Sequence, residues 1–292
     1  MSDSPLAAPS RVAVIIPCFN DGEFLRDAVE SVREVEPVEL VVVDDGSRDD
    51  TTLAVLAQLE CRRVRVLRHD SNRGLSAARN TGLAHTRAPY VFPLDADDLA
   101  LPGVLAQMAD VLDDHPWAVA CYGDYEVFGS DSFVRRTLRE FDPFRVAYRN
   151  ELTATALFRR TVLEQAGGWR PVVPGASGAD DIWEDWHLWM TLAERDARGI
   201  HAGEGVLTYR RRMHAPRLTA AGQERRRRQY RALRAAHPRL FSMLKDHRRR
   251  SSLPPWKKLL YPLVFANRPR LPLEYRIKAA LERRAGGVRR GG

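Results

Sequence analysis

Three acidic side chains lie close together in the segment Asp95-Ala96-Asp97-Asp98, directly after the apolar run from Tyr90 to Leu94. Carboxylates at the end of a buried strand repel one another and are costly to remove from water, so an opposing charge is expected beside them. A hard divalent cation such as Mn²⁺ or Mg²⁺ fits, because it takes oxygen ligands and leaves positions for a substrate diphosphate. The plainer alternative is a solvated turn, or an N-cap for the following helix. Two more acidic or polar loops at the same predicted edge favour the metal site.

Two further loops carry groups suited to a nucleotide. In Asp44-Asp45-Gly46-Ser47, the glycine permits a tight turn and an aspartate at the strand end can accept hydrogen bonds from a nucleobase or ribose. The alternative is an Asx-turn that caps the next helix. In Asn72-Arg73-Gly74 and at Arg79, guanidinium groups near a helix N-terminus suit phosphate. Here the alternative is a capped surface helix.

The elements that must position these loops alternate between strand and helix. Short β-branched runs predict strands at 12–17, 40–43, 64–67 and 90–94, and apolar spacing predicts helices at 21–35, 51–59 and 76–84. This order is typical of an α/β fold with a mostly parallel, doubly wound sheet and helices on both faces. Ligands of such sheets bind beyond the carboxyl ends of the strands, where CFND, DDGSRDD and DADD are all expected.

The pattern changes after about residue 103. A helix is expected at 104–112, strands at 118–125 and 132–138, and a short helix at 161–166 that Gly167 and Gly168 stop. Residues 171–179 are rich in Pro, Gly and Ser and predict a loop, and a helix with several apolar residues is expected at 185–197. From residue 223 onward the chain is basic, with a helical pattern.

Four segments in order, VAVIIPCFND, VVVDDGSRDDT, NRGLSAARNTGL and YVFPLDADD, resemble the family-2 glycosyltransferases of the GT-A fold. The resemblance is close over residues 11–103 and looser to about 219. It implies a glycosyltransferase domain over 1–220, with a nucleotide-sugar half at 11–103 and an acceptor half at 104–220. It also implies an inverting, metal-dependent enzyme that moves a sugar from a nucleotide-sugar donor, most often a UDP-sugar. The implied acceptor is a hydroxyl of a glycan or lipid-linked molecule in cell-envelope or polysaccharide biosynthesis.

The same resemblance assigns roles to the motif residues of the donor half. Asp97 corresponds to the direct metal ligand, with Asp95 nearer the ribose and also in the metal set. In the first nucleotide-binding loop the corresponding residues are Pro17, Phe19 and Asn20. The base-recognising aspartate corresponds to either Asp44 or Asp45, and the nucleotide-contacting arginine corresponds to Arg73.

A base must take the proton from the attacking acceptor hydroxyl. Trp183-Glu184-Asp185-Trp186 resembles the family's Glu-Asp motif, downstream of Gly167-Gly168-Trp169, and this makes Asp185 the base with Glu184 beside it. Asp180 and Asp181 remain alternatives to Asp185 as the base, and Asp185 itself can instead be a plain N-cap. His214 corresponds to a residue near the metal or the diphosphate, with a structural role as the alternative.

The charge is distributed unevenly along the 292 residues. Residues 221–292 contain 21 Lys and Arg against 4 Asp and Glu, whereas the chain as a whole has 46 basic and 38 acidic residues. This predicts an acidic catalytic body with a basic, helical extension at 221–292. Its apolar residues, interleaved with Lys257 and Lys258, favour peripheral contact with an anionic membrane through 224–292 over nucleic-acid binding. Solvated helix faces are the plain alternative.

Other sequence features narrow the class and the compartment. Three cysteines without a CxxC pair, and no apolar leader, favour a cytoplasmic protein, placed at the inner face of the cell membrane if the extension binds it. A nucleotidyltransferase also places acids at strand ends, but the expected Gly-rich basic loop after the first strand is missing from CFNDGEF. A non-catalytic nucleotide-sugar-binding module would need no base such as Asp185. No GxxxxGK[ST] motif for an ATPase occurs.

Overall fold

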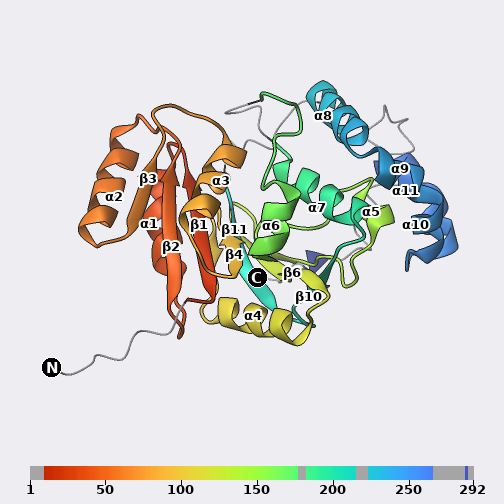
Figure 1. Cartoon of the computed structure of the whole chain (residues 1–292), viewed down its shortest axis with the longest axis horizontal. Helices are drawn as coiled ribbons and strands as arrows, with labels where there is room; N and C mark the ends of the chain where they lie inside the picture. The colour runs from red at the N-terminus through yellow and green to blue at the C-terminus, as the bar shows by residue number, and fades with distance from the viewer. Residues whose placement is uncertain (1–9, 177–181, 215–222, 266–286, 289–292) are drawn as a thin grey trace.

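Strand β1 (Val12–Cys18) is buried along its whole length and lies near the middle of the main sheet. In this computed structural model, residues 10–176, 182–214, 223–265 and 287–288 are described. The main sheet has seven strands in the order β10-β6-β9-β4-β1-β2-β3. Figure 1 shows the sheet between layers of helices, with the C-terminal helices grouped at one end of the molecule.

Six strands of this sheet are parallel and one runs against them. Parallel pairing joins β1 to its two neighbours, and β2 to β3, over the segments β2 (Val38–Asp44), β3 (Arg65–Arg68) and β4 (Tyr90–Pro93). A second parallel pair is formed by β6 (Ala118–Tyr122) and β10 (Arg198–His201). Strand β9 (Leu157–Arg159) is antiparallel to both β4 and β6 and joins the two groups. The carboxyl ends of β1, β2 and β4 therefore meet at one edge.

Both faces of the sheet are covered, which explains the continuous apolar runs in the strands. Side chains of one face, including Ile15 and Val41, pack with three helices: α3 (Leu75–His85), α6 (Arg160–Ala166) and α7 (Glu184–Glu194). Side chains of the other face, including Val14 and Val42, pack with α1 (Gly22–Ser31), α2 (Asp50–Cys61) and α4 (Val104–Asp114). The predicted doubly wound α/β architecture is confirmed.

A smaller sheet brings distant segments to the acid-rich loop after β4. Its order is β12-β8-β7-β11-β5, over Gly287–Val288, Phe133–Arg135, Asp124–Gly129, Leu207–Met213 and Leu99–Ala100. Strand β5 follows the acid cluster directly and pairs with β11, which runs parallel to β7. The strand predicted at 118–125 is in fact two, β6 and β7, which belong to different sheets. Strands β9, β10 and β11 were not predicted.

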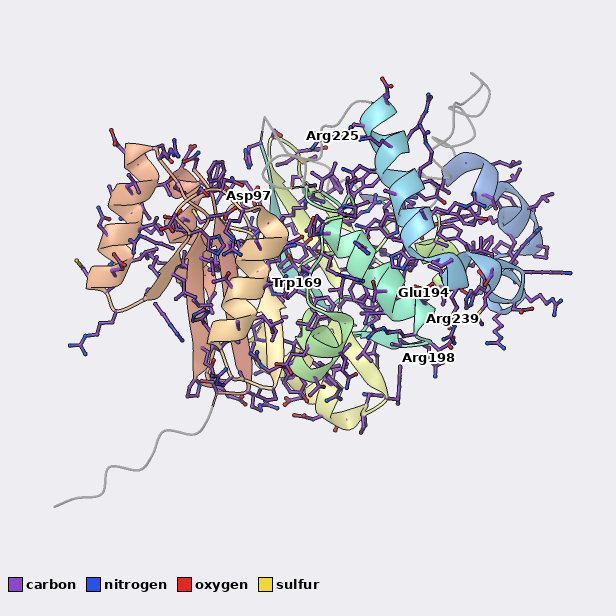
Figure 2. The ribbon with its side chains drawn as sticks, turned by 45° about the horizontal axis from the view of Figure 1, so that its top comes forward. Asp97, Trp169, Glu194, Arg198, Arg225 and Arg239 are labelled. Atoms are coloured by element: carbon purple, nitrogen blue, oxygen red, sulfur yellow. The ribbon has the colours of Figure 1, made fainter. Side chains whose placement is uncertain are left out.

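The described part of the basic extension is helical and packs onto the body. It forms α8 (Gln223–Ala236), α9 (Pro238–Ser242), α10 (Leu244–Arg250) and α11 (Pro255–Phe265). Tyr230, Leu233 and Leu240 belong to the same core cluster as α7. Glu194, at the end of α7, accepts hydrogen bonds from the backbone N–H of Arg239 and of Leu240, and Figure 2 shows Glu194 beside Arg239. None of the helices in the described ranges combines the length and apolar character that crossing a bilayer requires.

Candidate functional site

The loops after β1 and β2 are tied to each other. The backbone N–H of Asn20 donates to Ser47 Oγ (2.9 Å), and the N–H of Arg48 donates to Asn20 Oδ1 (2.9 Å). Asn20 adopts a left-handed backbone conformation (φ 56°), in which asparagine is among the most tolerated residues. Phe19 beside it is exposed, whereas Pro17 lies within the buried strand. These contacts hold the first two loops together at the strand ends.

The two aspartates that end β2 have different surroundings. Oδ1 of Asp45 lies 2.6 Å from His69 Nδ1 and accepts from the N–H of Arg73, while its Oδ2 accepts from the N–H of Gly74. Asp44 accepts from the N–H of Ser47 through Oδ1 (2.9 Å). Asp45 thus organises the chain before α3, and it leaves the Arg73 side chain exposed.

Gly46 is required by the close approach of these two loops. Its φ is +76°, and a Cβ atom at this position would lie 2.6 Å from the carbonyl carbon of Ser71. Only glycine combines this conformation with that contact. The turn after β2 can therefore lie directly against the segment that carries Arg73.

The three acids after β4, Asp95, Asp97 and Asp98, form a cluster in the structure. Carboxylate oxygens of Asp95, Asp97 and Asp98 all lie within 4.8 Å of one another. Asp98 is buried, and its pKa is raised well above the ordinary value by burial and then by the charges of Asp97 and Asp95. Like charges this close cannot all ionise without compensation. The oxygen-rich donor set suits a hard cation of the Mn²⁺ or Mg²⁺ kind.

Strand β11 and the residue after it supply polar groups to the cluster. The backbone N–H of Arg212 donates to Asp98 Oδ1 (2.9 Å), and Arg212 Nε donates to the carbonyl of Asp97 (3.0 Å). His214 Nε2 lies 2.9 Å from Asp97 Oδ2, and its ring packs against Phe24 with centroids 4.7 Å apart. His214 therefore lies next to the Asp97 carboxylate.

Asp21, which follows the first loop, is a further member of this electrostatic group. Burial, followed by the charge of Asp97, raises the pKa of Asp21 to about 6, and His214 opposes that rise. From the sequence, Asp21 was expected only as one of the polar residues of the CFND loop after the first strand. The effect of Asp97 on Asp21 arises from tertiary proximity that sequence spacing does not reveal.

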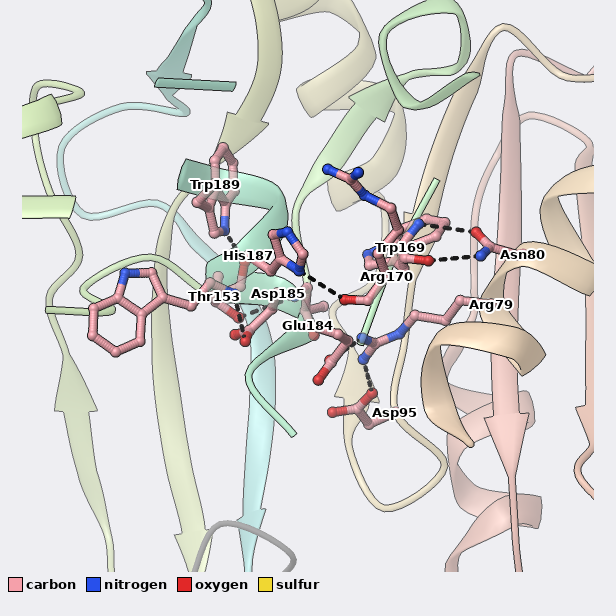
Figure 3. Close-up of polar contacts among 12 residues, drawn as sticks. Arg79, Asn80, Asp95, Thr153, Trp169, Arg170, Glu184, Asp185, His187 and Trp189 are labelled. Carbon is pink, nitrogen blue, oxygen red and sulfur yellow. Dashed lines mark hydrogen bonds and ion pairs between the residues drawn. The ribbon is translucent and has the colours of Figure 1, made fainter. Parts of the chain in front are cut away.

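Arg79 of α3 connects the acid cluster to the start of α7. It is 1% exposed, its Nη2 donates to Asp95 Oδ1 (2.6 Å), and its Nη1 donates to Glu184 Oε1. Figure 3 shows its guanidinium between the two carboxylates. Burial alone would lower the pKa of Arg79, but Asp95 and Glu184 outweigh it and raise that pKa. The sequence suggested Arg79 as a phosphate ligand, whereas here it bridges two site residues.

Asp185 lies in the first turn of α7, and its carboxylate accepts two hydrogen bonds. Asn150 Nδ2 donates to its Oδ2 (2.8 Å), and the backbone N–H of Trp186 donates to its Oδ1 (2.7 Å). Burial raises the pKa of Asp185, although the bond from Asn150 and the charge of Arg79 act in the opposite direction. Nothing in the sequence singled out Asn150. The alternatives Asp180 and Asp181 lie outside the described residues.

The residue before α7 has a strained backbone. Trp183 adopts φ 66°, which is uncommon for a bulky side chain, and its ring packs 5.2 Å from that of Trp186. Trp186 is buried, and its indole N–H donates to the carbonyl of Val146. Strain of this kind persists where the surroundings hold it, and it gathers at functional sites.

The Gly-Gly-Trp segment is clamped by α3. Asn80 Nδ2 donates to the carbonyl of Trp169 (2.7 Å), and the N–H of Trp169 donates to Asn80 Oδ1 (2.9 Å), as Figure 3 shows. Gly168 has φ +70°, and a Cβ atom there would lie 2.2 Å from Asn80 Oδ1. Gly167 also has positive φ (+81°), but a Cβ atom on it would meet nothing within 4 Å.

This contrast predicts different costs for two alanine substitutions. Gly167→Ala should lower the free energy of unfolding by about 1 kcal/mol, the cost of a left-handed alanine. Gly168→Ala should cost about 3 kcal/mol, because it also displaces Asn80 and its two hydrogen bonds to Trp169. Urea unfolding of both variants measures the difference. Equal costs would show that Asn80 does not hold this segment.

A cavity of about 800 Å³ lies elsewhere, between β10, α10 and the residues before α5 (Pro143–Val146). It shares no residue with the acid cluster or with Asp185. Arg198, on its wall, lies far from Asp97 in Figure 2. The acid cluster and Asp185 therefore lie outside this cavity.

Comparison with known proteins adds independent findings. The sequence profile of the family described as "Glycosyl transferase family 2" matches residues 13–167. The succinoglycan biosynthesis protein ExoU of Rhizobium meliloti is 42% identical over 104 residues, which cover 35% of this chain and 30% of ExoU. The protein WfgD of Escherichia coli, named as a UDP-Glc:alpha-D-GlcNAc-diphosphoundecaprenol beta-1,3-glucosyltransferase, is 25% identical over 68% of this chain and 76% of its own.

The chain spans less than half the length of some relatives, 30% of ExoU and 43% of ExoO of the same organism. Solved structures share the fold. S. aureus TarS 1–349 in complex with UDP-GlcNAc has a TM-score of 0.60 at 17% identity, over 85% of this chain and 69% of that one. The mannosyltransferase PcManGT from Pyrobaculum calidifontis, in complex with GDP-Man and Mn²⁺, has a TM-score of 0.52 at 24% identity, over 96% and 77%.

Proposed function

The chain belongs to glycosyl transferase family 2 and has the GT-A-type fold, and from this premise we propose that it transfers a sugar from a nucleotide-sugar donor to an acceptor hydroxyl. The proposed reaction is metal-dependent and inverts the anomeric centre, with a UDP-sugar as donor. The observation that carries it is Arg79, which holds Asp95 of the acid cluster on one side and Glu184, the neighbour of Asp185, on the other. Through Arg79, the proposed donor groups and the proposed base would belong to one site.

The nucleoside end of the donor is assigned to the interlocked loops after β1 and β2. Pro17, Phe19 and Asn20 would line it, and the exposed Arg73 would reach the nucleotide. Between the two aspartates we assign base recognition to Asp44, because Asp45 already receives bonds on both oxygens from His69, Arg73 and Gly74. Asp45 then serves by holding the loop that presents Arg73.

This assignment predicts opposite phenotypes for the neighbouring aspartates. Asp44→Ala should weaken UDP binding about 10–100-fold, the effect of one lost hydrogen bond to a charged group, and should lower the free energy of unfolding by only about 1 kcal/mol through the lost bond from the N–H of Ser47. Asp45→Ala should lower the free energy of unfolding by about 3 kcal/mol, because it removes the acceptor of the Arg73 N–H, the partner of the buried His69 ring and one of the two acceptors of the Gly74 N–H. Calorimetric titration with UDP and urea unfolding separate the two. A stable Asp45→Ala protein that fails to bind UDP would reverse the assignment.

The ion would be held by Asp97, Asp95 and His214, with Asp98 as a further carboxylate in reach. Mn²⁺ or Mg²⁺ bound there would neutralise charge that develops on the departing nucleoside diphosphate. The close approach of the three carboxylates and the 2.9 Å contact between His214 and Asp97 support this ligand set. The complex of PcManGT with GDP-Man and Mn²⁺ is consistent with a divalent ion in this fold.

Asp185 is proposed as the general base. Its carboxylate would accept the proton of the acceptor hydroxyl while that oxygen bonds to the anomeric carbon and the bond from this carbon to the diphosphate oxygen breaks. Asn150 fixes the orientation of the carboxylate, and the raised pKa of Asp185 makes it a better proton acceptor. Glu184 is paired with Arg79 and would position the base rather than act as one. A single displacement by this route inverts the anomeric centre.

The acceptor is proposed to be a glycan or lipid-linked molecule of cell-envelope or polysaccharide biosynthesis. The names of ExoU and WfgD support this class. A lipid-linked acceptor would place the enzyme in the cytoplasm at the inner face of the membrane, in peripheral contact through the basic extension. The experiment is to incubate the protein with Mn²⁺ and a panel of nucleotide sugars and measure release of the nucleoside diphosphate. Release from UDP-sugars alone supports the donor assignment, and release from none contradicts it.

A further inference from the structure

Helix α11 presents a row of large apolar side chains to solvent. Trp256 is 47% exposed, Leu259 60% and Leu263 46%. Spacings of three and four residues put all three on one side of the helix. Only seven large apolar residues are exposed in the described part of the chain, and three of them make this row. We call Trp256, Leu259 and Leu263 the outer row.

The opposite side of α11 is anchored, so the helix cannot turn to bury the outer row. Tyr261, Val264 and Phe265 form a buried cluster with Phe144. The hydroxyl of Tyr261 donates to Glu151 Oε2 (2.7 Å). The apolar residues of this segment are thus divided into an inner set that packs on the body and an outer row that does not.

Cations lie near the start of the outer row. Lys257 and Lys258 lie on α11 itself, and Lys257 Nζ is 5.3 Å from the ring centre of Trp256. The preceding helix ends in Arg248–Arg250, and Lys258 Nζ donates to the backbone carbonyl of Arg249 (3.1 Å). An apolar row with a basic border complements a surface that is apolar beneath an anionic layer.

We propose that the outer row of α11 docks on an anionic lipid bilayer, lying in the interface while the neighbouring lysines and arginines contact lipid phosphates. The tryptophan, an amphipathic ring suited to the headgroup level, stands at the start of the row. The eleven-residue helix is too short to span a bilayer and suits an interfacial position. This deepens the proposed function, on which its link to a lipid-linked acceptor rests, by naming the contact surface.

The docking helix sits on the segment that orients the proposed base. The ring of Tyr261 lies 6.4 Å from that of Tyr148, measured between ring centres, and its hydroxyl donates to Glu151. Asn150, which donates to Asp185, lies between Tyr148 and Glu151 in the sequence. A bilayer at the outer row would therefore lie on the side of the molecule that carries the partner of the base. A membrane-held acceptor would meet the enzyme on that side.

The test is sedimentation of the full chain with vesicles of phosphatidylcholine, with or without phosphatidylglycerol. Deletion of the extension is unsuitable, because it would remove Tyr230, Leu233 and Leu240 from the core. We expect binding to the anionic vesicles only. Trp256→Gln/Leu259→Gln/Leu263→Gln should weaken that binding at least about tenfold. Lys257→Gln/Lys258→Gln should weaken it about fivefold for each charge and reduce its salt dependence.

The matched control replaces two exposed apolar residues far along the chain, Val35→Gln/Leu53→Gln, and should bind the anionic vesicles as the unchanged protein does. Thermal unfolding shows that each variant is folded. Unchanged vesicle binding by the outer-row variant overturns the proposal, as does a dimer that only this variant loses, because the row then binds a second copy. Vesicle binding needs no donor, so UDP binding measured on the same samples tests the proposed function separately.

Discussion

Asp185→Asn is expected to lower kcat about 10²–10⁴-fold, the usual contribution of a positioned general base. The substitution keeps the shape of the side chain and removes its capacity to accept the proton of the acceptor hydroxyl. Asn150 and the N–H of Trp186 donate to the carboxylate of Asp185, so its orientation is set before substrate arrives. Steady-state kinetics with the identified donor and acceptor measure the loss.

The pH profile separates a base from a positioning residue. Burial raises the pKa of Asp185, so its proton-accepting form is lost as pH falls through a value above that of an ordinary aspartate. We expect kcat to fall tenfold per pH unit on this acid limb in the unchanged protein, and the limb to vanish in Asp185→Asn. UDP affinity should stay the same. A full-rate Asp185→Asn protein would move the base to Asp180 or Asp181.

Asp97→Asn is expected to reduce sugar transfer about 10³-fold, equivalent to about 4 kcal/mol of lost charge stabilisation. Asp97 lies within reach of Asp95, Asp98 and His214, so its carboxylate is the most central of the proposed ligands. Removing one charge also relieves the repulsion on Asp98, so the variant should be at least as stable as the unchanged protein in the absence of metal.

Activity at increasing Mn²⁺ distinguishes a ligand from a structural residue. The concentration of Mn²⁺ needed for half-maximal activity should rise in Asp97→Asn, and chelation should abolish transfer by the unchanged protein. Asp114→Asn, an exposed acid at the end of α4, is the control and should change neither. Full activity of the unchanged protein after chelation would show that transfer needs no metal.

The donor half could be predicted closely because its signals are local. The runs at 12–18 and 40–43 are apolar on both faces, which marks central parallel strands, and polar residues follow soon after each. The second half lacks such runs. Strand β9 has three residues, and β11 reads LTYRRRM, whose arginines conceal a strand that only pairing with β7 and β5 reveals.

The contacts across the site could not be predicted from spacing. Arg79 and Glu184 are 105 positions apart, and only the packing of α3 against the start of α7 brings them together. Asp44 and Asp45 are equivalent in sequence, and the difference between them depends on His69 and the turn at Gly74. Asn150 lies in an irregular segment without a motif.

The basic extension contains apolar residues that pack into the core, although its high charge suggested a solvated segment. Tyr230 and Leu233 of α8 and Leu240 of α9 stand among arginines, and all three belong to the same core cluster as α7. Net charge describes the solvent side of α8 and not its packing. The extension is therefore part of the folded body over its described residues, with the outer row of α11 at its surface.

The most direct test of the central claim is the thermal stability of the protein with UDP, GDP, ADP and CDP, each with and without Mn²⁺. A site formed by Asp97, Asp95 and His214 with the loops after β1 and β2 predicts that UDP raises Tm only when Mn²⁺ is present. At a concentration of 100 times Kd the gain should be about 2.7 kcal/mol, and Asp97→Ala should abolish it. Equal stabilisation by all four nucleotides without metal would contradict a metal-dependent UDP-sugar site.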